Sequence, residues 1–328
     1  MRLLVVSLFL SVLVAFGIVG CSNSETSGST SSNFSIGAGT TGGGFHTGAT
    51  ALSNVINDKV SESQASVQVT GASVDNVGLL QEGEIKIGFS STETAYEAYK
   101  GEHQFDGKSH DKLRTVFPGW PGVYMFVTFQ ESGIENIEDL QGKSYSSGPS
   151  GSSNQVFADR VFETFNIEPN TSNLPTDDAA NALKDGTIEG FSIAWPASAV
   201  TRLETSHKLN IVTLNEEQKK KFSEVYPQYL WLSIPPDTYE SIPKGVENFG
   251  LYNLLLASKD VSNETIYEIV KAAYENKDMI EEVMPQMAKG MSMENLGSTT
   301  IPYHPGAVEY FEEQGVEIPN ELLPPGSE

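Results

Sequence analysis

Two glycine-rich turns hold most of the side chains that could do chemistry. The first, IGAGTTGGG at Ile36–Gly44, follows a short apolar strand and precedes a helical pattern. The second, GPSGSS at Gly148–Ser153, has the same place between a strand and a helix. Glycine lets a ligand approach the backbone without meeting a Cβ, and a helix N-terminus offers unpaired N–H groups with a partial positive charge. Each turn therefore predicts a cradle for a small anion.

The first turn also contains G-x-G-x-x-G, the spacing of dinucleotide sites, at Gly37–Gly42. That fingerprint needs an acidic residue at the end of the next strand to hold the ribose. Here that strand ends at residues 69–72, VTGA, without an acid. The sequence GKS at Gly142–Ser144 resembles the end of a phosphate-binding P-loop, but Ile137 stands where the earlier glycine is needed. We therefore predict no nucleotide cofactor, and no other cofactor.

Catalysis and metal binding are alternatives from other functional classes. The serine-hydrolase pattern G-x-S-x-G is missing, since Ser152 stands where the second glycine should be. An exported hydrolase-like enzyme would use His46 beside serine or threonine hydroxyls. A metal-capturing lipoprotein would need His103 and His110 to converge, although their spacing is not that of a zinc site. We predict neither enzymatic activity nor a bound metal.

The N-terminus has the pattern of an export signal. A basic start, Met1-Arg2, is followed by an uncharged and mostly apolar run to Gly20 and then by Cys21. Residues 18–21, IVGC, resemble a bacterial lipobox, while a membrane-spanning anchor is the alternative because the run is just long enough to span. We predict a signal peptide at 1–20 and lipidation of Cys21. We expect residues 21–33 to form a flexible serine- and threonine-rich tether. The folded part is then predicted to be extracytoplasmic and anchored to the membrane, at the cell surface or in a periplasm.

The overall composition narrows the possible partners. The chain has 328 residues and a formal charge of −23, from 20 Lys and Arg against 43 Asp and Glu. A charge of this sign argues against a nucleic-acid partner and is typical of a well-solvated acidic surface. The single cysteine excludes a disulfide within the chain.

Strand and helix patterns alternate along the chain. Residues 34–36, 66–69 and 85–89 predict strands, with helices between them, and residues 114–117 and 124–129 predict two further strands separated by PGWPG. This order is typical of a parallel sheet covered by helices, and the two similar turns indicate two α/β lobes with a cleft at the carboxyl ends of the strands. We predict lobe 1 at 34–125 plus 246–328 and lobe 2 at 126–245.

Six motifs in order resemble one protein family over the range Phe34–Gly315. They are IGAGTTGGG (36–44), GASVDN (71–76), GPSGSSNQ (148–155), ALKDGTIEGF (182–191), IPPDTY (234–239) and HPGAVEYFEEQG (304–315). In these motifs the chain resembles the TAXI-type solute-binding proteins of TRAP transporters. The resemblance implies an α/β, two-lobed, type II periplasmic-binding-protein-like fold that closes on a small carboxylate such as glutamate. It also implies a monomer that delivers its solute to a membrane permease.

The resemblance further implies where a solute would lie. The residues that match the family's ligand-contacting turns are Thr40, Thr41, Gly42, Gly43, Phe45, His46, Ser73, Asn76, Ser91, Thr92, Gly148, Ser150, Ser152, Ser153, Ala194 and Trp195. Two places depart from the family pattern. Phe45-His46-Thr47 stands where Tyr-Tyr-Pro is frequent, and Ser91-Thr92-Glu93 where Gln-Ser-Asp is common. Because the first change replaces phenol hydroxyls by an imidazole, we expect His46 to favour a more acidic or larger solute than glutamate.

Overall fold

The computed structural model describes residues 32–61 and 63–326. The predicted signal peptide, Cys21 and all but the end of the tether lie outside these residues. Residues 31–328 form one compact unit. Within the described ranges, no helix combines the length and the apolar character that a membrane crossing requires.

Strands and helices alternate through most of this unit. The strands are β1 (Ser32–Gly37), β2 (Ser63–Gln68), β3 (Ile87–Ser91), β4 (Leu113–Phe129), β5 (Ser144–Ser146), β6 (Asn170–Ser172), β7 (Gly190–Trp195), β8 (Leu209–Val212), β9 (Leu230–Ile234) and β10 (Val246–Ser258). The helices are α1 (Gly44–Lys59), α2 (Ser73–Glu82), α3 (Thr92–Lys100), α4 (Ser153–Phe165), α5 (Thr176–Lys184), α6 (Ser198–Glu204), α7 (Glu216–Val225), α8 (Asn263–Glu275), α9 (Lys277–Val283), α10 (Pro285–Gly290) and α11 (Pro305–Glu313).

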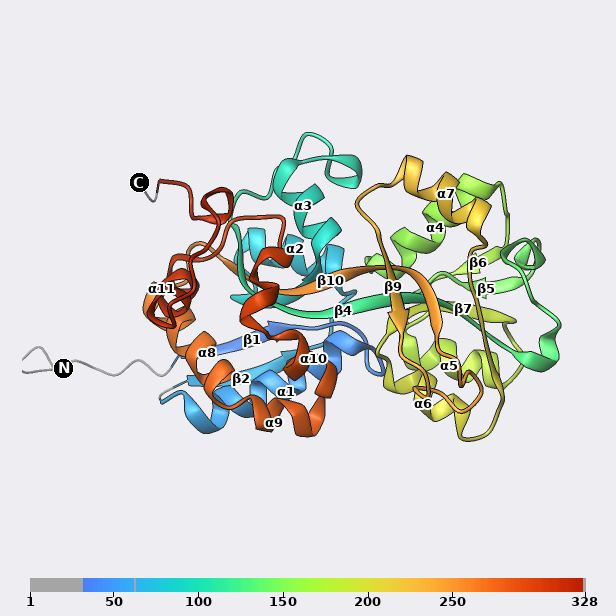
Figure 1. The fold of residues 1–328 in the computed structure, drawn as a ribbon, viewed down its shortest axis with the longest axis horizontal. Coiled ribbons are helices and arrows are strands. Elements are labelled where there is room, and N and C mark those ends of the chain that lie inside the picture. Colours follow the sequence, from blue (N-terminus) through green and yellow to red (C-terminus); the bar gives the residue numbers. More distant parts are fainter. Residues whose placement is uncertain (1–31, 62, 327–328) are drawn as a thin grey trace, which may run out of the picture. The chain divides into compact units, whose positions relative to one another are not determined.

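The strands of the described chain join in one mixed sheet. Its order is β2-β1-β3-β10-β4-β7-β5-β6, with β8 paired to β4 and β9 paired to β10. The flanks are parallel, as the alternation of strands and helices predicts, because β1 pairs in parallel with β2 and β3, and β5 with β6 and β7. The centre is antiparallel. There the long strands β4 and β10 run side by side in opposite directions (Figure 1).

The expected break between residues 114–117 and 124–129 is wrong, because β4 runs without interruption from Leu113 to Phe129. Asn253 of β10 pairs with Trp120 and its neighbour Leu254 pairs with Pro118, so Gly119 is an extra residue in the ladder. A β-bulge of this kind bends a strand and tolerates proline within it. The PGWPG segment therefore bends β4 rather than ending it.

The buried apolar side chains divide the unit in two. Two clusters use residues from Phe34 to Trp120 and from Leu254 to Leu322. The other two use residues from Val123 to Leu251. We call these two groups lobe 1 and lobe 2; among the described elements, only β4 and β10 contribute to the cores of both. The predicted lobe boundaries, at 125/126 and 245/246, stay a prediction.

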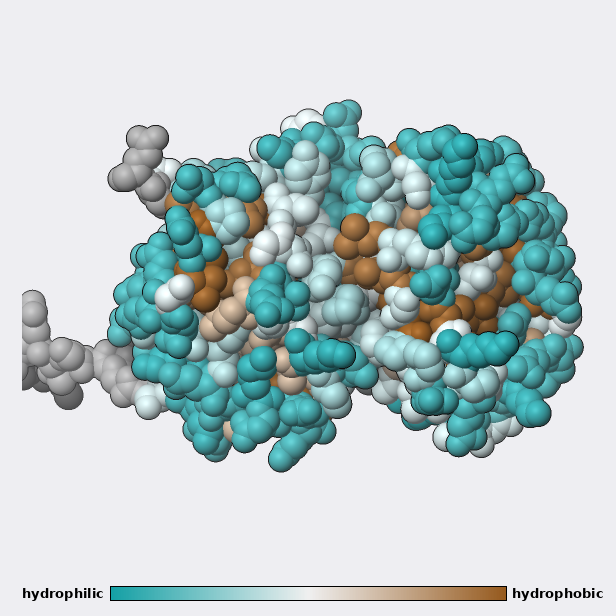
Figure 2. All heavy atoms as spheres, viewed as in Figure 1, coloured by the Kyte–Doolittle hydropathy of each residue, from teal (hydrophilic) through white to brown (hydrophobic). Residues whose placement is uncertain are grey.

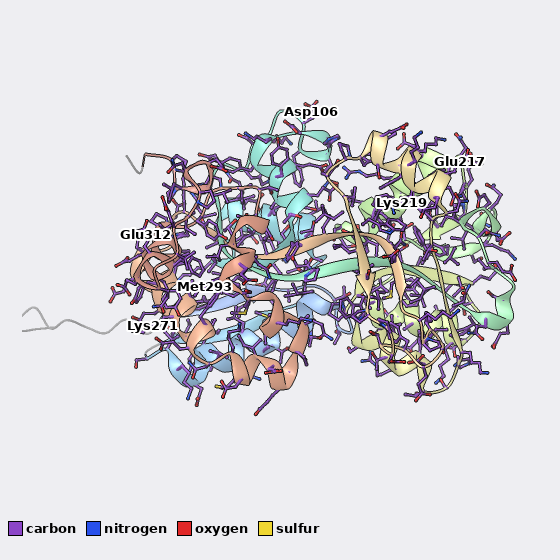
Figure 3. The ribbon with its side chains drawn as sticks, viewed as in Figure 1. Asp106, Glu217, Lys219, Lys271, Met293 and Glu312 are labelled. Carbon is purple, nitrogen blue, oxygen red and sulfur yellow. The ribbon has the colours of Figure 1, made fainter. Side chains whose placement is uncertain are left out.

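The surface carries most of the acidic residues. Asp106, Glu217 and Glu312 are exposed and lie at the periphery of the ribbon (Figure 3). Figure 2 shows a mostly hydrophilic face, with apolar patches near β9 and near α11. This distribution is what solvation of a strongly acidic chain requires.

One histidine is buried as a neutral residue in lobe 1. His304 is the N-cap of α11: its Nδ1 accepts a hydrogen bond from the Gly306 N–H at 3.2 Å, and its Nε2 lies 3.1 Å from the Val261 carbonyl oxygen. These partners fix the tautomer that carries its proton on Nε2. Burial lowers the pKa of His304 from 6.5 to about 4.

We expect His304 to make the protein less stable in acid. Because its pKa in the folded protein is below the ordinary value, the unfolded state binds more protons between pH 6.5 and pH 4, and stability falls as the pH falls through that window. Between pH 7 and pH 5 this one group costs about 2 kcal/mol of unfolding free energy. His304→Asn keeps an N-cap acceptor and removes the titration. Urea unfolding at both pH values should show a smaller acid loss in the variant, and equal losses would contradict the assignment.

Candidate ligand cleft

A cavity lies between the two lobes and is lined by residues of both. Its volume is about 50 Å³, several times the ~10–15 Å³ that one buried water needs. The residues that line it are Gly39, Thr40, Gly43, Gly44, Phe45, Ala72, Trp120, Gly122, Tyr124, Pro149, Ser152, Ser153, Asn154, Thr176, Ile193, Ala194, Trp195, Pro196, Leu251 and Asn253. These lining residues include no Lys, Arg, His, Asp or Glu. The cavity is therefore neutral in its side chains and offers hydroxyls, amides and aromatic rings.

The two glycine-rich turns bring a helix N-terminus to each side of this cavity. α1 starts after Gly43, and its first residues, Gly44 and Phe45, line the cavity. α4 starts after Ser152, whose side chain caps the helix by accepting from the Gln155 N–H at 3.2 Å. The N–H groups of a first helical turn have no acceptor within the helix. Two positive helix ends, one from each lobe, thus meet at the cavity and can hold an anion between them.

Direct hydrogen bonds join the turns of the two lobes around the cavity. Thr40 Oγ1 donates to Thr176 Oγ1 at 2.9 Å and accepts from the Thr176 N–H at 3.1 Å. On the opposite side the Val74 N–H donates to the Gly151 carbonyl oxygen at 2.9 Å. The first turn meets α6 as well, since the Ala199 N–H donates to the Gly42 carbonyl oxygen at 3.2 Å. These bonds describe a closed cleft.

Aromatic rings form much of the remaining wall. Phe45 meets Trp120 edge to face at a centroid separation of 6.0 Å, and Trp120 in turn contacts Phe89 at 5.3 Å. In lobe 2, Tyr124 stacks on Phe157 at 4.3 Å. Burial raises the pKa of Tyr124 far above its ordinary value, against the opposing effect of a hydrogen bond with Ser153. Tyr124 is therefore a neutral phenol at any physiological pH.

The structure places seven of the sixteen predicted site residues on the cavity wall. These seven are Thr40, Gly43, Phe45, Ser152, Ser153, Ala194 and Trp195. Five others lie within the turns or next to them without lining the cavity: Thr41, Gly42, His46, Gly148 and Ser150. The remaining four, Ser73, Asn76, Ser91 and Thr92, are buried. Contact of any of them with a solute stays a prediction.

Asn76 and Ser73 organise the strand ends beneath the cavity. The Asn76 amide donates to the carbonyl oxygens of Ala38 and Phe89, at 2.7 and 2.8 Å, and accepts from Thr70 Oγ1 at 2.8 Å. This set of bonds ties the ends of β1, β2 and β3 together. Ser73 is the first residue of α2, and its Oγ accepts from the Ser91 N–H at 3.3 Å.

None of the three histidines considered for catalysis or metal binding, His46, His103 and His110, lines the cavity. His46 is in the first turn of α1, and its ring is not among the lining groups. His103 Nε2 lies 3.7 Å from Glu97 Oε1, whereas His110 packs against Phe105 with its Nδ1 2.9 Å from the Lys108 carbonyl oxygen. Among the residues that the structure describes, no group of three or more His, Cys, Asp or Glu could hold a metal ion.

Several lining residues were missed by sequence reasoning. Tyr124 and Asn253 come from the two long strands, and Thr176 starts α5. Asn253 is the lone amide in the apolar run LYNLLLA, and such an exception within a buried strand is a signal that could have identified it. Tyr124 and Thr176 carry no comparable signal.

Comparison with known proteins places the chain in a family. The profile of the NMT1-like family matches residues 36–315, from β1 to the end of α11. The chain belongs to the NMT1-like family. The resemblance to the TAXI group is finer than this match and stays a proposal.

Solved structures share the fold of this NMT1-like chain at low sequence identity. MatC from Rhodopseudomonas palustris has a TM-score of 0.55 at 10% identity, covering 78% of this chain and 88% of that one. A structure described as a putative L-cystine ABC transporter from Listeria monocytogenes has a TM-score of 0.51 at 11% identity, and the match covers 79% of this chain and 98% of that one. An ancestral arginine-binding protein has a TM-score of 0.50 at 12% identity, and the match covers 78% of this chain and 97% of that one. The NMT1-like chain therefore has the mixed α/β fold of type II periplasmic binding proteins.

Proposed function

We propose that the protein is an extracytoplasmic solute-binding receptor of a TRAP-type transporter of the TAXI group. It captures a small carboxylate, such as glutamate or a related amino acid or dicarboxylate, by closing its two lobes, and delivers it to the membrane permease. The observation that carries this proposal is the neutral cavity between two opposing helix N-termini. A carboxylate placed there would receive N–H groups from both lobes and so favour their closure.

The solved structures with this fold support a small-solute ligand. MatC was solved with bound malate, and the ancestral arginine-binding protein with bound arginine. A neutral cavity holds a carboxylate through helix-end N–H groups and hydroxyls, without a cationic side chain. The predicted signal peptide and the lipidated Cys21 belong to the same proposal, because a tethered receptor meets its permease at the membrane. We propose a monomer without a cofactor.

Titration calorimetry tests the ligand class. We expect L-glutamate, another amino acid or a small dicarboxylate such as malate to bind at micromolar levels or tighter. Ser153→Ala removes a hydroxyl from the cavity wall, and we expect it to weaken binding about tenfold, the value of one buried hydrogen bond. Ser206→Ala, at an exposed serine that lines no part of the cavity, is the matched control and should leave affinity unchanged. Absence of micromolar binding across the whole panel would reject the proposed ligand class.

A further inference from the structure

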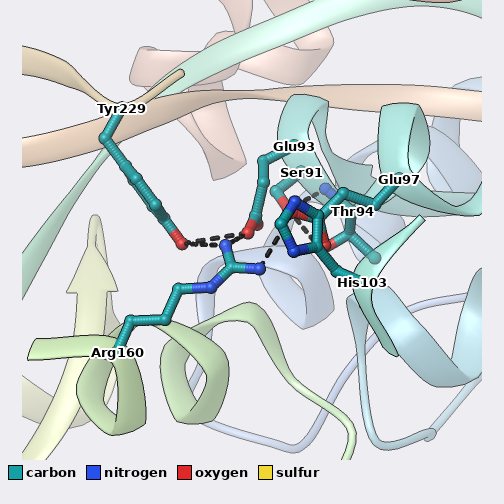
Figure 4. Close-up of polar contacts among 7 residues, drawn as sticks. All are labelled: Ser91, Glu93, Thr94, Glu97, His103, Arg160 and Tyr229. Carbon is teal, nitrogen blue, oxygen red and sulfur yellow. Dashed lines mark hydrogen bonds and ion pairs between the residues drawn. The ribbon is translucent and has the colours of Figure 1, made fainter. Parts of the chain in front are cut away.

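A group of charged side chains is buried where α3 of lobe 1 meets lobe 2. Arg160 of α4 pairs with Glu93 Oε1 through Nη1, and its Nη2 donates to Glu97 Oε1 at 2.9 Å (Figure 4). Tyr229, just before β9, donates from its hydroxyl to Glu93 Oε1 at 3.0 Å and accepts from Arg160 Nη1 at 3.0 Å. Two carboxylates from one lobe thus share one guanidinium from the other. We call these four side chains the interlobe cluster.

The interlobe cluster is almost completely removed from water. The side chains of Glu93, Glu97 and Arg160 are 0%, 3% and 10% exposed. With both carboxylates ionised, the cluster would hold a net charge of −1 in a site that excludes water. The second oxygens, Glu93 Oε2 and Glu97 Oε2, are buried and have no hydrogen-bond partner within the described chain. Burying an uncompensated charge costs several kcal/mol, so such a site favours a bound proton.

The contacts indicate which carboxylate would hold that proton. Glu93 Oε1 pairs with the guanidinium and accepts a hydrogen bond from the Tyr229 hydroxyl, whereas Glu97 Oε1 accepts one from the guanidinium. The half-exposed ring of His103 is 3.7 Å from Glu97 Oε1. Burial raises the pKa of Glu97 to about 7, and the charge of Glu102 acts in the same direction. The phenols of Tyr124, Tyr226 and Tyr229 are also close enough for the charge of Glu97 to raise their pKa values.

We propose that the interlobe cluster is a latch for the closed cleft, and that Glu97 takes up one proton when the lobes close. Separation of the lobes returns the Glu97 carboxylate to water, where it is ionised. On closure a solvent proton adds to a carboxylate oxygen of Glu97, giving a carboxylic acid, and leaves Glu93 and Arg160 as a neutral ion pair. No other bond changes. The proposal rests on the proposed function only in requiring that the lobes open and close.

This latch makes closure depend on pH in a defined direction. The closed state holds the extra proton between the ordinary pKa of 4.5 and the closed-state value of about 7, so closure becomes more favourable as the pH falls through that window. We expect the closing equilibrium to be at least about tenfold more favourable at pH 5.5 than at pH 8. Glu97→Gln stays neutral at both pH values. This variant should close at pH 8 as readily as the wild type does at pH 5.5.

Pulsed electron paramagnetic resonance measures closure without requiring a known ligand. Nitroxides on Asp106→Cys in lobe 1 and Glu217→Cys in lobe 2, in a Cys21→Ser background, report the interlobe distance; both positions are exposed. The wild type should shift toward shorter distances from pH 8 to pH 5.5, and Glu97→Gln should show no such shift. His103→Gln is the control that removes the neighbouring imidazole and should keep the shift. An unchanged wild-type distribution, or a shift retained in Glu97→Gln, would overturn the latch.

Adding L-glutamate or malate to the same samples separates the two proposals. A distance that responds to pH but to neither solute supports the latch and counts against these ligands. A distance that responds to a solute but not to pH overturns the latch and leaves the proposed function standing. Arg160→Met, which leaves both carboxylates without their cation, should favour the open distance at pH 8. A closed distribution in that variant at pH 8 would also contradict the latch.

Discussion

Gly71→Ala should weaken solute binding about 100-fold while leaving the unfolding free energy of the protein nearly unchanged. Gly71 lies at the turn between β2 and α2, where a Cβ would collide with the carbonyl oxygen of Ser150 in the other lobe. The Ser150 carbonyl oxygen belongs to the backbone of the turn that leads into α4. It therefore cannot rotate away as a side chain could. The collision exists only when the cleft is closed. The added Cβ should therefore make closure of the cleft less favourable by about 3 kcal/mol. A loss of that size weakens solute affinity about 100-fold.

Gly78→Ala is the matched control for this prediction. Gly78 lies in α2 of the same lobe, and a Cβ there would meet nothing within 4 Å. Alanine is favoured over glycine within a helix by about 1 kcal/mol, so this variant should be slightly more stable and bind as the wild type does. Calorimetric titration with the strongest solute of the amino-acid and dicarboxylate panel measures affinity, and urea unfolding measures stability. Wild-type affinity in Gly71→Ala would show that closure does not bring Gly71 against Ser150.

The cavity-forming turns were predictable because their signals are local. Glycines between an apolar strand and a helical pattern identify a strand-to-helix turn, and both turns prove to carry a helix N-terminus to the cavity. The buried amide of Asn76 was harder to interpret. Its motif placed it beside the site, but only the tertiary structure shows that it bonds the ends of neighbouring strands. A side chain can thus belong to a functional motif by supporting the turns that form the site.

Contacts between distant parts of the chain could not be predicted from the sequence. Glu93 and Arg160 are 67 residues apart in the sequence, with the crossing strand β4 between them, and nothing in either neighbourhood indicates that they pair. The same holds for Tyr124, which looks like an ordinary strand residue until β4 and β10 cross between the lobes. The wrong prediction of a strand break at the PGWPG segment has a related cause. Proline and glycine predict a break locally, whereas pairing with β10 keeps them in the strand as a bulge.

Trp120→Ala should cost about 3–5 kcal/mol of unfolding free energy, the range for removing a large aromatic side chain from a packed core. Trp120 is 1% exposed. Its indole lies against α1, where a Cβ on Gly48 would come within 2.8 Å of the ring, and it contacts the rings of Phe45 and Phe89. Gly48 of α1 thus leaves the room that the indole occupies. Urea unfolding measures the loss.

Trp231→Ala makes the same chemical change at a site that is only half-buried. Trp231 of β9 contacts Phe249 at a centroid separation of 5.0 Å and carries Lys219 over its ring at 4.1 Å. Water can reach the space that the smaller side chain leaves, so we expect a loss of about 1 kcal/mol. Because the Trp120 indole is also part of the cavity wall, its replacement should weaken solute binding, whereas Trp231→Ala should not. Equal stability losses in the two variants would mean that α1 collapses onto the vacated site, and that the indole does not hold α1 and β4 apart.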